Sequence, residues 1–259
     1  MSRIKNTFGK DKVLIAFVTG GDPNIETTKR LIRAISAAGA DIIEIGIPFS
    51  DPIAEGPVIQ AASARALAAG CTTDKLLDMV AELRKDIKTS LLFMTYANPV
   101  FAYGKEGFMK RCAECGIDGL IIPDTPYEER DEFAGVCSLY SIDLISMVTP
   151  TSADRAKEIA KVGQGFLYCV SSLGVTGVRD KLTSEIANVI KVVREVSDIP
   201  CAIGFGISTP EQAKQMVHYA DGVIVGSAIV KLIAEHGVNS IEPVAAYVSE
   251  IKKAIRGTL

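Results

Sequence analysis

The sequence has 259 residues, of which 48% are hydrophobic, and its formal net charge is −3. This length fits one large barrel or two smaller domains, and the hydrophobic content is enough for a substantial core. No basic stripe runs along the chain, so we expect no binding to nucleic acid. No apolar run approaches the ~18 residues of a membrane span, and the N-terminal segment lacks the apolar stretch of a signal peptide, so we expect a cytoplasmic protein without membrane contact.

Short apolar segments recur along the chain, and most are rich in β-branched residues. They are bounded by Gly, Pro, Asp or Ser, and their near-continuous hydrophobicity is typical of parallel strands that are buried on both faces. We therefore predict eight strands, over residues 13–18, 41–46, 90–96, 118–123, 142–148, 165–170, 200–204 and 222–226.

Amphipathic helical patterns lie between these segments. Leu31, Ile32 and Ile35 share one helix face, and a second helix is capped by Thr72 or Thr73. Eight strands alternating with helices in about 250 residues predict a (β/α)8 TIM barrel. A doubly wound sheet is the rival, but the first strand lacks a G-x-G-x-x-G turn. No linker composition interrupts the chain, so we predict a single domain over residues 1–259.

Glycine-bearing loops follow the last three predicted strands. Gly206 comes after the seventh strand, and Gly226 and Ser227 come after the eighth, where Ser227 could cap the next helix. Barrels hold phosphate groups at these two loops, because glycines let the backbone approach a ligand and helix starts present free N–H groups. The alternative is a pair of tight turns. The loop after the sixth strand carries Thr176 and Gly177 and is long enough to cover a ligand.

Two acidic residues lie near the end of the second predicted strand. Glu44 shares one strand face with Ile42 and Gly46, so it should point into the barrel close to its mouth. A buried carboxyl has a raised pKa, which suits proton transfer near neutral pH. Glu55 follows in a loop stiffened by prolines, and it could divide acid–base work with Glu44. The alternatives are a Glu44 that is paired for structural reasons and a Glu55 that is a solvated loop charge.

Aromatic and apolar side chains also fall at the predicted strand ends. Together they would form an apolar chamber beneath the phosphate loops, suited to a substrate with a flat apolar part. The chamber residues are Phe17, Met94, Tyr96, Val148, Tyr168 and Phe205.

The cysteines point to packing rather than to chemistry. Cys112 and Cys115 form a C-x-x-C at a predicted helix end closed by Gly116, and the chain has only two histidines. A redox pair needs a helix N-terminus, and a metal site needs more ligands nearby. We expect no metal site.

The ordered motifs resemble those of one family, the alpha chain of tryptophan synthase. The similarity runs nearly end to end, and phosphate-binding barrels in general share only the glycine loops. The matching segments are AFVTGGDP, GADIIEIGIPFSDPIAEGPVIQ, MTYANPVFAYG, GLIIPDTPYEE, FLYCVSSLGVTG, GFGIS and GSAIVK.

The resemblance implies a lyase that carries out retro-aldol cleavage of indole-3-glycerol phosphate to indole and glyceraldehyde 3-phosphate in tryptophan biosynthesis. Glu44 matches the family's general acid–base residue, and Glu55 stands where the family has an Asp that contacts the indole N–H. The positions that match the indole pocket are Phe17, Tyr96, Tyr168, Thr176 and Phe205. The positions that match the phosphate site are Gly177, Gly206, Gly226 and Ser227.

The family's alpha chain needs no cofactor of its own and docks on a pyridoxal-phosphate beta chain. The resemblance therefore implies an alpha2-beta2 heterotetramer, with the loops around Asp51 and Pro126 at the interface. Glu55 departs from the family pattern by one methylene, and a misplacement of about 1 Å can lower a rate ~100-fold. Two alternatives stay open: a weakly catalytic subunit that binds ligand and activates a beta chain, and a phosphate-binding barrel with another reaction.

Overall fold

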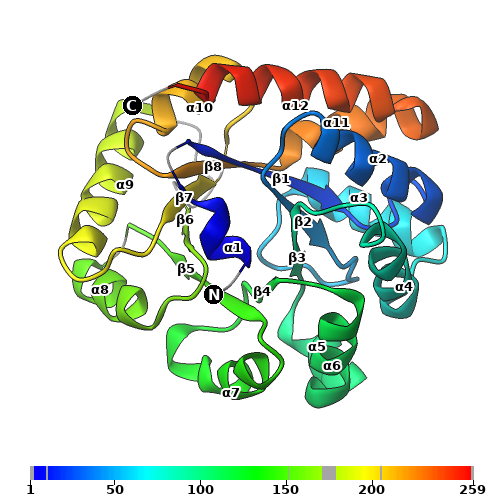
Figure 1. The fold of residues 1–259 in the computed structure, drawn as a ribbon, viewed down its shortest axis with the longest axis horizontal. Helices are drawn as coiled ribbons and strands as arrows, with labels where there is room; N and C mark the ends of the chain where they lie inside the picture. The colour runs from blue at the N-terminus through cyan, green and yellow to red at the C-terminus, as the bar shows by residue number, and fades with distance from the viewer. Residues whose placement is uncertain (1–2, 10, 151, 171–178, 205, 258–259) are drawn as a thin grey trace.

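The computed structural model describes residues 3–9, 11–150, 152–170, 179–204 and 206–257. Its strands run parallel and follow one another in chain order around a closed barrel, in which β8 pairs with β1. Helices surround the strands (Figure 1). The prediction of a (β/α)8 TIM barrel is confirmed.

The strands lie where the apolar segments predicted them, within a few residues at each end. They are β1 (Val13–Thr19), β2 (Ile42–Gly46), β3 (Ser90–Met94), β4 (Gly119–Ile121), β5 (Asp143–Val148), β6 (Leu167–Val170), β7 (Cys201–Gly204) and β8 (Gly222–Val225).

The helices of the described chain include several with the side-chain caps that the sequence suggests. Thr72, rather than Thr73, caps α4, and Thr209 forms a capping box with Gln212 at α10. The helices are α1 (Arg3–Thr7), α2 (Ile25–Ala37), α3 (Pro57–Ala68), α4 (Thr73–Leu83), α5 (Ala97–Tyr103), α6 (Lys105–Cys115), α7 (Asp131–Leu139), α8 (Ala153–Val162), α9 (Arg179–Arg194), α10 (Pro210–Met216), α11 (Ser227–His236) and α12 (Ile241–Ile255), with short 3-10 turns η1 (Tyr127–Glu129) and η2 (Gly237–Asn239). Within these ranges no helix is both long and apolar enough to cross a bilayer.

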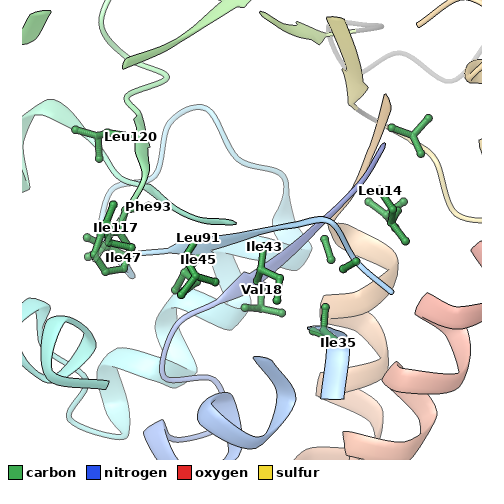
Figure 2. Close-up of a cluster of buried hydrophobic side chains, with 14 of the residues drawn as sticks. Leu14, Val18, Ile35, Ile43, Ile45, Ile47, Leu91, Phe93, Ile117 and Leu120 are labelled. Carbon is green, nitrogen blue, oxygen red and sulfur yellow. The ribbon is translucent and has the colours of Figure 1, made fainter. Parts of the chain in front are cut away.

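Strand alternation divides the hydrophobic core into two clusters. An inner cluster fills the barrel with side chains such as Ile15, Ile42 and Leu92. An outer cluster lies between the barrel wall and the helices and includes Leu14 and Ile43, as Figure 2 shows. Because successive side chains on a strand point to opposite faces, these clusters fix which residues face the barrel interior.

Helix α1 closes the N-terminal opening of the barrel. It lies across this end of the strands (Figure 1), and its Ile4 is fully buried in the inner cluster. A Cβ atom on Gly119 would lie 2.7 Å from Ile4 Cδ1, so glycine at the start of β4 leaves room for the Ile4 side chain of α1. The opposite, C-terminal end carries the loops in which barrel enzymes place their chemistry.

Side chains at the N-terminal end repeat one hydrogen-bond arrangement around the barrel. A side chain one to three residues before each even-numbered strand accepts an N–H from the preceding odd-numbered strand, so each bond ties two neighbouring strands together. The bonds are Leu14 N to Asp41 Oδ2 at 2.7 Å, Leu91 N to Asp118 Oδ2 at 2.9 Å, Leu144 N to Gln164 Oε1 at 2.9 Å and Cys201 N to Asp221 Oδ2 at 2.9 Å.

The three carboxylates in this arrangement also have cationic partners. Lys252 Nζ lies 2.6 Å from Asp41, and Arg194 lies 3.3 Å from Asp221. Asp118 pairs with both Arg84 and Arg3. Partly buried charges at this end are therefore compensated both by backbone and by side chains.

The C-x-x-C segment ends a helix, as predicted. Helix α6 finishes at Cys115, and Gly116 has a φ of 90°, a left-handed conformation that favours glycine. Cys112 and Cys115 are buried, and burial raises the pKa of the Cys115 thiol to about 11. These thiols are therefore protonated packing groups at neutral pH.

Candidate active site

Glu44 points into the barrel from the middle of β2. Its register partner on β1 is Phe17, and the inward neighbour Ile42 belongs to the inner cluster. The Glu44 side chain is fully buried, and in the described part of the chain neither carboxyl oxygen has a hydrogen-bond partner. Burial, with a smaller effect from the charge of Glu55, raises the pKa of Glu44 to about 8. An acid of this kind is protonated at neutral pH.

Glu55 lies in the loop between β2 and α3, and it is half-buried. Its Oε2 atom is buried without a partner among the described residues, and burial raises the pKa of Glu55 to about 7. Because the charge of Glu55 acts on Glu44, the two predicted carboxyls lie close enough to interact. The pair combines a mainly protonated group with one that is ionised in part.

Three hydrogen bonds hold the backbone around Glu55. The Ala54 N–H donates to the Tyr96 hydroxyl at 3.1 Å, and Gln60 Nε2 donates to the Glu55 carbonyl at 2.8 Å. The Glu55 N–H donates to the Pro52 carbonyl at 3.1 Å. Asp51, the third acid of this stretch, is exposed and accepts from the Ser50 hydroxyl. The loop therefore aims one carboxyl inward and leaves the other in solvent.

Aromatic rings pack around the carboxyl pair. Tyr96 is 2% exposed, and its ring centroid lies 5.4 Å from that of Phe49. Burial and the nearby charge of Glu55 raise the pKa of the Tyr96 hydroxyl. Burial and the charge of Glu44 likewise raise the pKa of Tyr168. Tyr96 thus lies near Glu55, and Tyr168 lies near Glu44.

Two glycines leave space for these rings. A Cβ atom on Gly204 would lie 2.5 Å from Tyr168 Cε1, so the ring rests directly against the β7 backbone. A Cβ atom on Gly46 would lie 2.8 Å from Phe17 Cζ. Val148, expected in the same chamber, belongs instead to the outer cluster, because its place in the β5 alternation turns it toward the helices. That prediction is wrong.

The described phosphate candidates follow the neighbouring strands β7 and β8. Gly206 has a φ of 76°, and Gly226 is the N-cap of α11. Ser227 is the first residue of α11, with no side-chain cap bond at this helix start, so the prediction that Ser227 caps the helix is wrong. The cap position falls one residue earlier. Thr176, Gly177 and Phe205 lie outside the described residues.

One ion pair beside the mouth was missed by the sequence analysis. Asp22, which is 1% exposed, accepts two hydrogen bonds from Arg65, at 2.9 Å from Nε and 2.7 Å from Nη2. Arg65 lies on α3, so the pair fastens the helix that begins just after Glu55 to the loop after β1. The available signal was an acid three residues after the end of β1, in the motif GGDP.

Together, the fold and the mouth define a TIM-barrel protein with two interacting carboxyls of raised pKa and with glycine loops after β7 and β8, where barrel enzymes that act on phosphorylated compounds hold the phosphate. A family model for the tryptophan synthase alpha chain matches residues 4–256. The tryptophan synthase alpha chain of Lacticaseibacillus casei is 46% identical over 255 residues, which cover 98% of this chain and 96% of that one. The chain belongs to the tryptophan synthase alpha chain family.

Solved structures agree with this assignment. The tryptophan synthase subunit alpha from Legionella pneumophila superimposes with a TM-score of 0.90 at 38% identity, covering 98% of both chains. A chain from the structure of Mycobacterium tuberculosis tryptophan synthase gives a TM-score of 0.89 at 33% identity, again over 98% of both chains. The similarity therefore extends over the whole barrel.

Proposed function

We propose that this chain is a carbon–carbon lyase that cleaves indole-3-glycerol phosphate to indole and glyceraldehyde 3-phosphate, as the alpha subunit of tryptophan synthase. The proposal depends on the surroundings of Glu44. Its carboxyl is fully buried, has no hydrogen-bond partner among the described residues, and has a pKa raised to about 8. Burying an acid without a hydrogen-bond partner lowers the stability of the fold, so its presence favours a catalytic role. Family membership supports the same reaction.

The raised pKa allows Glu44 to both donate and accept a proton. Protonated Glu44 donates its proton to indole C3, and the resulting carboxylate takes the proton of the C3′ hydroxyl. The C3–C3′ bond breaks, its electrons return to the ring, and the C3′ oxygen becomes the aldehyde of glyceraldehyde 3-phosphate. The acid is regenerated in its starting state, so no outside proton donor is needed.

Glu55 completes the pair by stabilising charge. Protonation at indole C3 places positive charge on the ring nitrogen. An ionised carboxyl that accepts a hydrogen bond from the ring N–H lowers the energy of that state. Its pKa of about 7 keeps part of the population ionised at neutral pH, while Glu44 stays mainly protonated. The environments of the two acids therefore separate their roles.

The remaining site residues would bind the two ends of the substrate. We assign the indole pocket to Phe17, Tyr96, Tyr168, Thr176 and Phe205, and the phosphate site to Gly177, Gly206, Gly226 and Ser227. Support comes from the rings near the two carboxyls and from the N-terminus of α11, whose free N–H groups suit an anion.

We also propose that the chain works with a tryptophan synthase beta chain in an alpha2-beta2 heterotetramer in the cytoplasm, with pyridoxal phosphate held by the beta chain and none here. The segments around Asp51 and Pro126 would contact the partner. Ile53, two residues after Asp51, is 81% exposed, and Phe101 on α5 is 48% exposed. Large exposed apolar side chains near the mouth are typical of a partner interface.

Indole release from indole-3-glycerol phosphate, with a beta chain present, tests the proposal. We expect turnover by the wild-type chain and its loss in Glu44→Gln. A wild-type chain that binds the substrate and raises beta-chain activity but releases no indole would overturn the lyase assignment. A chain that neither binds the substrate nor affects a beta chain would overturn the partner proposal as well.

A further inference from the structure

A pocket of about 250 Å³ lies between the β4–α7 loop and helix α8, over the C-terminal part of β5. It is lined by β5 residues 144–147 and by Ile122 and Ile159. Leu144, Ile122 and Ile159 belong to the outer cluster, so this part of the pocket is on the helix side of the strands, whereas Ile145 and Met147 pack with the inner cluster. The β4–α7 loop contributes Thr125, Tyr127 and Arg130, and α8 contributes Arg155 and Ile159.

The polar groups that line this pocket are donors or hydroxyls. They come from Arg130, Arg155, Thr125, Ser146, Thr149 and Tyr127, and of the described lining residues none is acidic. Arg155 is already paired with Glu128 at 2.6 Å. Arg130 forms no ion pair with the described residues and donates one hydrogen bond, from Nη2 to the Val162 carbonyl at 3.2 Å. The uncompensated charge of the pocket is therefore that of Arg130.

Two buried polar atoms at this pocket lack partners in the described part of the chain, namely Arg130 Nε and Thr125 Oγ1. Leaving a buried donor unpaired is unfavourable, and for a charged group the penalty is larger. An arginine whose Nε–H is free can offer a forked pair of donors to a planar or tetrahedral anion, and a threonine hydroxyl can donate a further bond. An anion would satisfy both atoms at once.

We propose that the pocket between the β4–α7 loop and α8 binds a small organic anion, whose carboxylate or phosphate is held by Arg130 and Thr125 and whose apolar body rests on Ile122, Leu144 and Ile159. Drug-sized ligands fill pockets of about 300–1,000 Å³, so this one suits a smaller molecule, such as a single-ring acid. The site uses none of the residues assigned above to catalysis or to the indole and phosphate sites, but Pro126 in its lining belongs to the segment proposed to contact the beta chain, so the test uses the alpha chain without that partner.

Benzoate is a suitable probe, with benzyl alcohol as its neutral counterpart and inorganic phosphate as an anion without an apolar body. NMR of isoleucine methyl groups reports the place of binding, since Ile122 and Ile159 lie in the pocket and Ile59 packs beside Phe17 near the mouth. We expect benzoate to shift the Ile122 and Ile159 signals, benzyl alcohol to shift them at much higher concentration, and Ile59 to stay unchanged.

Two variants test the assigned contacts. Arg130→Gln and Thr125→Val should each weaken benzoate binding, by about tenfold or more for Arg130→Gln, because a hydrogen bond to a charged group is lost. The control is Arg111→Gln, which removes a surface arginine of α6 that is paired with Asp78 of α4. It should leave benzoate binding unchanged. Shifts confined to Ile59, equal binding of benzyl alcohol, or unchanged affinity in both pocket variants would overturn the proposal.

Discussion

Three aspartates at the N-terminal end of the barrel and two glutamates near its mouth carry the same functional group in opposite surroundings. At the N-terminal end Asp41, Asp118 and Asp221 each accept a backbone N–H and each face a Lys or Arg. Near the C-terminal end Glu44 is fully buried and Glu55 is half-buried, and their buried oxygens have no partner among the described residues. Compensated carboxylates stabilise a fold, whereas uncompensated ones keep their protons and remain available for chemistry.

This contrast separates stability from activity along the barrel axis. Substitutions at the N-terminal end should lower the free energy of unfolding and spare the turnover of folded protein. Substitutions of Glu44 or Glu55 should lower turnover and spare or even raise stability, because they remove carboxyls whose buried oxygens lack partners among the described residues. The following variants test this separation, from the largest expected effect to the smallest.

Replacing Glu44 with Gln should have the largest effect. The amide keeps the shape of the side chain but cannot transfer a proton, so indole release should fall by about 10²–10⁴-fold. Glu114→Gln, an exposed change on α6, should leave indole release at the wild-type rate. Substantial turnover in Glu44→Gln would show that another group moves the proton.

Replacing Asp118 with Ala should affect stability instead. Both Asp118 and Arg84 are nearly buried, with side chains 11% and 12% exposed, and the change leaves Arg84 and the Leu91 N–H without this partner. Breaking such a pair lowers the free energy of unfolding by about 3–5 kcal/mol. Urea denaturation measures this loss, and kcat at a temperature where the variant is folded should stay near the wild-type value. A lower kcat with unchanged stability would contradict the comparison.

Shortening Glu55 to Asp should lower turnover in this chain. Bonds to Tyr96 and Gln60 hold the loop backbone in place, so removing one methylene withdraws the carboxyl from its position, and a shift of about 1 Å can reduce a rate ~100-fold. We expect indole release to fall by roughly tenfold or more. A rise in turnover would instead make Glu55 a defect and favour the weakly catalytic, ligand-binding subunit.

Removing the Tyr96 hydroxyl should produce the smallest effect. Tyr96→Phe keeps the ring but leaves the Ala54 N–H without its acceptor, a loss worth about 1 kcal/mol. If the bond positions Glu55, kcat should fall by about fivefold with little change in KM. A change in KM alone would mean that the hydroxyl contributes to substrate binding and not to the position of the loop.

The strand positions could be predicted from the sequence, because a parallel strand that is buried on both faces has a continuous run of apolar residues. The match is closest where the run ends at a polar residue, as for the run 13–18 and β1 (Val13–Thr19). The run 118–123 overshoots β4 (Gly119–Ile121), because Ile122 stays buried beyond the last ladder bond. Hydrophobicity reports burial, whereas strand ends depend on pairing with a neighbour.

The sequence predicted the site residues whose direction follows from side-chain alternation along a strand. It did not predict contacts between segments that are far apart in the chain. The inward direction of Glu44 follows from its parity with Ile42 along one strand. The bonds of Asp41 to Leu14 and of Arg65 to Asp22 join residues 27 and 43 positions apart, and no local period carries that information. The sequence placed the N-cap of α11 at Ser227 instead of Gly226, an error of one residue. The geometry of the preceding turn can shift a helix end by this amount.

The pH dependence of stability tests the account of Glu44 most directly. The pKa of Glu44 is about 8 in the folded chain against an ordinary value of 4.5, so the folded state binds the proton more tightly than the unfolded state. The contribution of Glu44 therefore falls as pH rises through the window between 4.5 and 8, by about 3–5 kcal/mol in all.

Urea denaturation of the wild-type chain and of Glu44→Gln between pH 5 and pH 9 measures this contribution. We predict that the wild-type chain loses stability relative to the variant as pH rises, with the difference levelling off above pH 8. Parallel curves across this range would mean that Glu44 is ionised and compensated in the folded chain, which would contradict the difference between the two ends of the barrel.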